Sequence, residues 1–143
     1  LVSSAGAGSL MASLFLASRV SISQLAGQVG GAALLAGTAL VAFALNSVAP
    51  LAYPILMLLG FSVVLVAAGS NTLLQSWVRD DMRGRVMAIF TMAFLGIAPL
   101  GSLALGSATH FLGIRPALVS FGTLAIVAAL AHRQRLRLAS SGI

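Results

Sequence analysis

Two long stretches of this chain contain no charged residue. Positions 20–78 hold none, and after Arg85 the next charged residue is Arg115. Soluble domains carry charge on about a quarter of their residues, whereas here the charged share is 7% and the hydrophobic share is 59% of 143 residues. Uncharged segments of this length fit the interior of a lipid bilayer. The sequence therefore predicts a membrane protein.

The net charge of +6 does not indicate a nucleic-acid partner. Nucleic-acid recognition needs a basic face on a soluble surface, and these arginines separate apolar segments instead. Cysteine is absent, which excludes disulfides and thiolate metal sites. We find no nucleophile with a base, no metal-ligand cluster and no phosphate-binding loop, so the sequence predicts no enzyme, no metal and no cofactor. Because the chain begins at Leu1 and lacks a basic leader, we interpret it as a fragment.

The arginines divide the chain into lengths that could each cross a membrane. A transmembrane helix needs roughly 20 apolar residues, since its backbone must satisfy its own hydrogen bonds in lipid. We predict an all-α, polytopic transmembrane helix bundle with five spans in a single domain. Asn46 and Pro50 bracket one turn, and Pro116 suits the first turn of the last helix. The predicted spans are residues 1–18, 25–46, 50–75, 82–109 and 116–132, followed by a basic interfacial tail at 133–143.

The distribution of arginines tests this topology independently of hydropathy. Cytoplasmic loops are enriched in Lys and Arg. With five spans, Arg115 is the single arginine on one side of the membrane, and all the others fall on the opposite side, namely Arg19, Arg79, Arg83, Arg85, Arg133, Arg135 and Arg137. The pattern predicts a cytoplasmic C-terminus.

Small residues within the spans predict close helix packing. Gly27 and Gly31 form a GxxxG motif, which suits either general helix contact or a specific dimer face. In the fourth span, Pro99 cannot donate a hydrogen bond to the carbonyl of Leu95, so we expect a bend there, with Gly96 and Gly101 admitting a close neighbour. A moving helix and a static kinked helix both fit this pattern.

Polar residues occur toward the end of the third span. Asn71 and Gln75 share a helix face by their spacing of four residues and could line a pathway, bond to another helix or lie at the interface. Trp77 is typical of an interfacial anchor. His110 and His132 fall at span ends. No Asp, Glu, Lys or Arg lies at mid-membrane in any span, so these spans contain no evident proton relay.

Both acidic residues of the chain lie in the run from Arg79 to Arg85. Asp80 or Asp81 could cap the following helix by accepting hydrogen bonds from its first amides. The helix dipole offers nothing to Arg83 or Arg85, which need pairing with the aspartates, pairing with another segment or an explanation from topology. A few such contacts could bias a two-state equilibrium, since about 1.4 kcal/mol is a tenfold shift.

This region resembles a known family. Positions 71–87 read NTLLQSWVRDDMRGRVM, and positions 94–101 read FLGIAPLG. The two segments are similar to a pattern of the major facilitator superfamily, in its enterobactin-exporter-like and transmembrane secretion effector branch. That pattern is N-T-L-x-Q-x-x-V-x-D-x-x-R-G-R-V-M followed by G-x-x-P-x-G, between the tenth and eleventh helices.

The resemblance implies helices eight to twelve of a twelve-helix transporter, and so a partial major facilitator superfamily fold. It implies a proton-driven exporter of small, drug-like or siderophore-like molecules in the bacterial inner membrane, working by alternating access with an N-terminal half that holds the coupling residues. The implied gating loop is Asp80, Asp81, Arg83, Gly84 and Arg85, and the implied half-to-half interface contains Gly96, Pro99 and Gly101. One departure is that the loop after the first span keeps Arg19 alone, where the family often has several arginines.

Two other functions are open to this sequence. A small, non-transporting membrane scaffold would also explain the packing glycines and the absence of mid-membrane charge. A small dual-topology multidrug exporter is disfavoured, because such proteins depend on a membrane-embedded glutamate and this chain has no glutamate.

Overall fold

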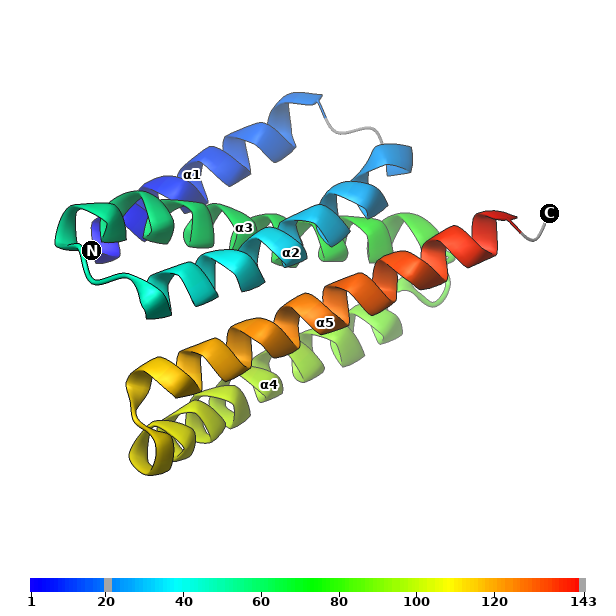
Figure 1. Ribbon diagram of the computed structural model, residues 1–143. Helices are drawn as coiled ribbons and strands as arrows, with labels where there is room; N and C mark the ends of the chain where they lie inside the picture. Colours follow the sequence, from blue (N-terminus) through cyan, green and yellow to red (C-terminus); the bar gives the residue numbers. More distant parts are fainter. Residues whose placement is uncertain (20–21, 142–143) are drawn as a thin grey trace.

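The computed structural model describes residues 1–19 and 22–141, which form five α-helices (Figure 1). Successive helices run in opposite directions, so each crosses the bundle from one end to the other. Their bounds are α1 Val2–Arg19, α2 Ile22–Leu45, α3 Ala49–Trp77, α4 Arg83–Leu112 and α5 Ile114–Ser141.

Four of these helices are long and apolar enough to cross a membrane, as expected of a membrane protein. They cover Gln24–Leu45, Ala49–Trp77, Arg83–Leu112 and Ile114–Gln134, and the apolar helix at Val2–Ser18 is shorter. The 18 residues of α1 rise only about 27 Å at 1.5 Å per residue, against a hydrocarbon core of about 30 Å. The prediction of five helices is confirmed, and four of them meet the length expected of a span.

The helices contact one another in an order that differs from their order in the chain. α3 packs against both α1 and α2, and α2 also packs against α5. α4 lies beside α5 and barely touches α3, although α3 precedes it directly in sequence (Figure 1). The resulting spatial order is α1, α3, α2, α5, α4.

Of the two turns at one end of the bundle, the one between α2 and α3 forms as the sequence predicts. The Asn46 side-chain amide donates to the carbonyl of Val48, and Asn46 Oδ1 accepts from the N–H of Val48, both at 2.9 Å. Pro50 lies in the first turn of α3. Between α4 and α5 the connection is shorter than predicted, because Gly113 alone separates them. Gly113 has φ of 86°, which glycine adopts without a steric penalty, and its N–H bonds to the carbonyl of Thr109.

The last helix extends beyond its predicted end. We predicted a basic tail from residue 133, but the backbone continues as α-helix to Ser141. The segment has no proline or glycine before Gly142 to stop the helix, and arginine and leucine are good helix formers. The side chains of Arg135 and Arg137 are not among those that the structure describes.

Glycines bring the backbones of α1 and α3 into direct contact. A Cβ built on Gly8 would collide with the carbonyl of Met57, and one on Gly60 would collide with the carbonyl of Ala5. The Ser9 hydroxyl adds a long hydrogen bond to the carbonyl of Gly60, at 3.4 Å. In lipid this close approach replaces the hydrophobic attraction that holds helices together in water. Next to this contact lies a small buried cluster of Ala12, Ala32 and Leu65.

A second glycine contact joins α2 to α5. A Cβ on Gly37 would lie 2.7 Å from the Ile126 side chain, and one on Gly122 would lie 2.6 Å from the Val41 side chain. By contrast, a Cβ on Gly27 or Gly31 would meet nothing within 4 Å. Close packing is thus confirmed, but the GxxxG motif does not supply it among the described residues, because Gly27 and Gly31 lie on a face of α2 turned away from α3 and α5.

The α4 helix is the most exposed part of the described bundle. None of its residues is buried, and a Cβ on Gly96, Gly101 or Gly106 would meet nothing within 4 Å. The helix nevertheless continues through Pro99 to Leu112. α4 therefore presents its small residues to whatever surrounds the bundle.

The glycine contacts can be tested by adding one methyl group. We expect Gly60→Ala to lower the melting temperature of the detergent-solubilised protein, because the new Cβ overlaps the α1 backbone and overpacking costs about 1–3 kcal/mol. Gly31→Ala is the matched control, since its Cβ enters open space, and it should leave the melting temperature unchanged or slightly raised. Equal effects of the two variants would contradict the packing described here.

The alternation of helix directions predicts which positions share a membrane face. The chain has no cysteine, so single cysteines can be labelled in intact cells with a membrane-impermeant maleimide without competing thiols from this segment. Ser47→Cys and His110→Cys should either both be labelled or both be protected from the maleimide. Gly84→Cys should give the opposite result. Labelling of Gly84→Cys together with Ser47→Cys would show that α3 does not cross the membrane.

Candidate functional site

The loop between α3 and α4 carries two ion pairs. The carboxylate of Asp80 accepts from the guanidinium of Arg83 at 2.8 Å, and that of Asp81 accepts from Arg79 at 3.2 Å. Each pair joins residues two or three positions apart, so both pairs lie within the loop and the first residue of α4. Pairing of the aspartates with arginines, one of the explanations that the sequence allowed, is confirmed for Arg83.

The prediction that an aspartate caps α4 is wrong. The N-cap residue is Met82, and no side chain bonds to the first amides of the helix. Asp80 and Asp81 precede the N-cap by two residues and one residue, where a short side chain is not placed to reach those amides. Their carboxylates bind guanidinium groups instead.

Both pairs are open to solvent or to the lipid headgroups. The Asp80 and Arg83 side chains are 88% and 48% exposed, and exposed pairs contribute only about 0–1 kcal/mol. Arg85 makes no hydrogen bond or ion pair with another described residue, and Gly84 has open space around it. The loop therefore has a low energetic cost of opening and one guanidinium ready for an external partner.

The polar residues of α3 lie next to a crevice between α3 and α4. The Gln75 amide donates to Asn71 Oδ1 at 3.1 Å, which confirms that the two share a helix face. Asn71 lines a cavity of about 300 Å³. The other lining residues are mostly apolar, namely Ala67, Ala68, Met87, Phe90, Thr91, Phe94 and Leu95.

Two aromatic rings form one wall of this crevice. Phe90 and Phe94 stack with centroids 6.0 Å apart and an angle of 24° between their planes. Sequence analysis missed both residues, although their spacing of four positions on a helix puts them on one face. This spacing does not show what the rings face, because the neighbouring helix is set by the tertiary structure. An amide beside stacked rings suits a flat, amphipathic molecule.

A second cavity lies where four helices meet at the Arg79 end of the bundle. It measures about 310 Å³ and is lined by Trp77 and His132 together with Ala26, Val29, Ser70, Leu73, Leu74 and Phe90. Phe90 lines both this cavity and the α3–α4 crevice. Trp77 is 68% exposed, as expected for a ring at the membrane interface. The two cavities therefore adjoin at Phe90.

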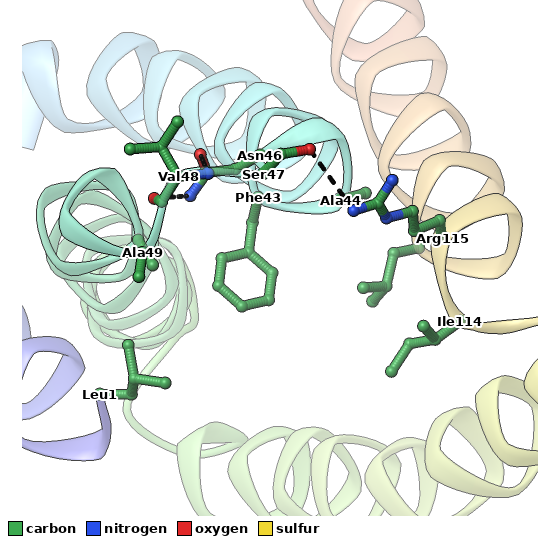
Figure 2. A pocket seen from close by; sticks show the side chains of 11 residues that line it. Leu1, Phe43, Ala44, Asn46, Ser47, Val48, Ala49, Ile114 and Arg115 are labelled. Atoms are coloured by element: carbon green, nitrogen blue, oxygen red, sulfur yellow. Dashed lines mark hydrogen bonds between the residues drawn. The ribbon is translucent and has the colours of Figure 1, made fainter.

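The opposite end holds a third cavity, which Figure 2 shows from close by. The Arg115 guanidinium donates to the Ser47 hydroxyl at 3.4 Å, so α5 is linked to the turn between α2 and α3. The ring of Phe43 points into the space, with Ile114 at its rim (Figure 2). Sequence analysis placed Arg115 at this end but did not identify Ser47, whose partner is 68 positions away.

The exposure of the loop pairs leads to a test of stability. We expect Asp80→Asn to change the melting temperature of the solubilised protein little, because an exposed pair contributes about 1 kcal/mol at most. Gly60→Ala, which disturbs a buried helix contact, provides the comparison. A loss in Asp80→Asn as large as in Gly60→Ala would show that the loop is structural rather than free to open.

Comparisons with known proteins identify no relative of this chain. No protein-family model matches the chain, and no match was found among the curated proteins or the solved structures. The features that bear on function are therefore the loop pairs, the α3–α4 crevice and the uncovered face of α4.

Proposed function

We propose that this chain is the C-terminal half of a secondary active transporter of the major facilitator superfamily, a proton-driven exporter of small amphipathic molecules. The observation that carries the proposal is the α3–α4 pair. These two helices enclose a crevice with an amide and two stacked rings, and the loop that joins them holds two exposed ion pairs. The crevice thus lies next to a loop whose exposed ion pairs cost little free energy to break.

The helix arrangement supports the proposed fold, because one half of the bundle has a central helix that the other half lacks. α3 packs between α1 and α2, while α5 and α4 lie side by side with no helix between them. α2 and α5 meet at paired glycines, Gly37 and Gly122. If that contact relates two similar halves, a further helix belongs against α4 and α5, as α3 packs against α1 and α2. The open Gly96, Gly101 and Gly106 offer the small surface that such a helix, or the other half of the transporter, would contact.

In this proposal the α3–α4 loop acts as a latch, which means that its contacts hold the transporter in one state of alternating access and break in the other. Transport requires two states of similar free energy, and about 1.4 kcal/mol changes their ratio tenfold. Two exposed pairs at about 0–1 kcal/mol each are of that size. Arg85 is free to bind a group of the N-terminal half in one state and to release it in the other. The proton-coupling residues belong to that half, because these spans carry no mid-membrane charge.

The distribution of arginine supports a cytoplasmic position for the Arg79 end in a bacterial inner membrane. The C-terminal ends of α1, α3 and α5 lie at the same end of the bundle (Figure 1). All arginines except Arg115 belong to these ends, to the loop that follows α3 or to the first turn of α4. Under the positive-inside rule that end faces the cytoplasm.

Efflux measured in cells tests the transporter directly. Cells expressing the full-length protein should retain less ethidium, a flat amphipathic cation, or less of a catecholate siderophore than cells without it. A proton uncoupler should abolish the difference. Arg83→Ala and Arg85→Ala should lose most of the efflux at unchanged membrane abundance, because the latch is lost but the exposed side chains support little packing.

Ser13→Ala serves as the control, since its exposed hydroxyl bonds only within α1. Full efflux in both arginine variants would reject the latch. The absence of efflux for every probe would favour the alternative, a non-transporting membrane scaffold. One observation favours that alternative, namely the unoccupied Gly27 and Gly31 face of α2, which could receive a helix of another protein.

A further inference from the structure

We propose that the cavity at the Arg115 end binds an anionic phospholipid, with the phosphodiester on Arg115 and Ser47 and the start of an acyl chain along the apolar wall. This inference requires only that the chain lies in a membrane, and it does not depend on transport. The cavity measures about 330 Å³, which is at the small end for ligand sites of about 300–1,000 Å³. It suits part of a lipid rather than a whole drug-sized molecule.

The charge at this end of the bundle has no internal counterion. The chain has two acidic side chains, Asp80 and Asp81, and both are paired with arginines at the opposite end. Arg115 therefore cannot be neutralised by any carboxylate side chain of this sequence. Its link to the Ser47 hydroxyl is long, at 3.4 Å, and a guanidinium has five N–H donors. It has no other hydrogen-bond partner among the described residues, so most of its capacity to bind an anion is unused.

Some polar groups around the cavity already have hydrogen-bond partners, and others are available to a ligand. The Asn46 amide is engaged, because it bonds in both directions to the backbone of Val48. The Ser47 hydroxyl accepts from Arg115 (Figure 2). It donates to no described residue, so its own hydrogen is available to a ligand. Arginine binds phosphate through two parallel N–H bonds, and the hydroxyl adds a third donor beside them. The available donors thus match the oxygens of one phosphate group.

The remaining lining identifies the ligand as a lipid rather than as a free anion. Phe43, Ala52, Ile114 and Leu118 form an apolar wall next to the guanidinium. Phe43 points into the space and Ile114 stands at its edge (Figure 2). Because helices α2, α3 and α5 begin or end here, the cavity lies at the level of the headgroups. A phosphate joined to an apolar chain is the anion that occupies that level.

Native mass spectrometry of the full-length protein, released from mixed micelles of phosphatidylglycerol and phosphatidylcholine, tests the site. The unaltered protein should retain one more phosphatidylglycerol than Arg115→Gln, and its apparent affinity should exceed that of the variant by about tenfold, as expected for hydrogen bonds to a charged group. Ser47→Ala should weaken retention less. Arg115→Lys should fall between, because lysine keeps the charge but not the paired donors.

Arg79→Gln is the matched control, since Arg79 is an exposed arginine already paired with Asp81. It should retain as much phosphatidylglycerol as the unaltered protein. Equal losses in Arg79→Gln and Arg115→Gln would show that retention follows total charge, and would overturn the site. Equal retention of phosphatidylcholine, or displacement of the lipid by glycerol 3-phosphate at equal concentration, would also overturn it, because the acyl chain would then contribute nothing.

Discussion

The interior of a bilayer offers no water to a polar backbone, and this constraint shapes the whole structure. Every span must satisfy its own N–H and C=O groups, which leaves the helix as the only form available to single apolar segments of this chain. The same constraint sends charge to the helix ends. All eight arginines lie at or beyond the ends of uncharged stretches, close in sequence to every connection between helices except the one between α2 and α3.

Once the helices form, contact between them depends on small residues rather than on the burial of large ones. α1 meets α3 at Gly8 and Gly60, and α2 meets α5 at Gly37 and Gly122. α4 lies beside α5 but has no comparable glycine contact, because a Cβ on Gly96, Gly101 or Gly106 would meet nothing within 4 Å. An uncovered helix with open glycines next to a polar loop differs from the tightly held α1–α3 pair. The bundle therefore has one closely packed side and one open side.

Local signals predicted much of this structure. Asn46 and Pro50 formed the turn that their side chains favour, and the pairing of Asn71 with Gln75 followed from helical spacing. The signals failed where two local interactions competed. Asp80 and Asp81 are good capping residues, but arginines lie close enough to bind their carboxylates first. The GxxxG motif makes no close contact among the described helices, because the motif indicates that a close approach is possible without indicating which helix is approached.

The sequence by itself determined that the chain is helical, where each helix begins within a few residues and which ends carry charge. These properties depend on hydropathy, turn chemistry and electrostatics, which act over a few positions. Only the tertiary structure decided that α3 lies between α1 and α2, that Phe90 and Phe94 face Asn71 across a crevice, and that Arg115 reaches Ser47. These contacts join residues far apart in the chain, and they depend on the shapes of helix faces that no single segment reveals.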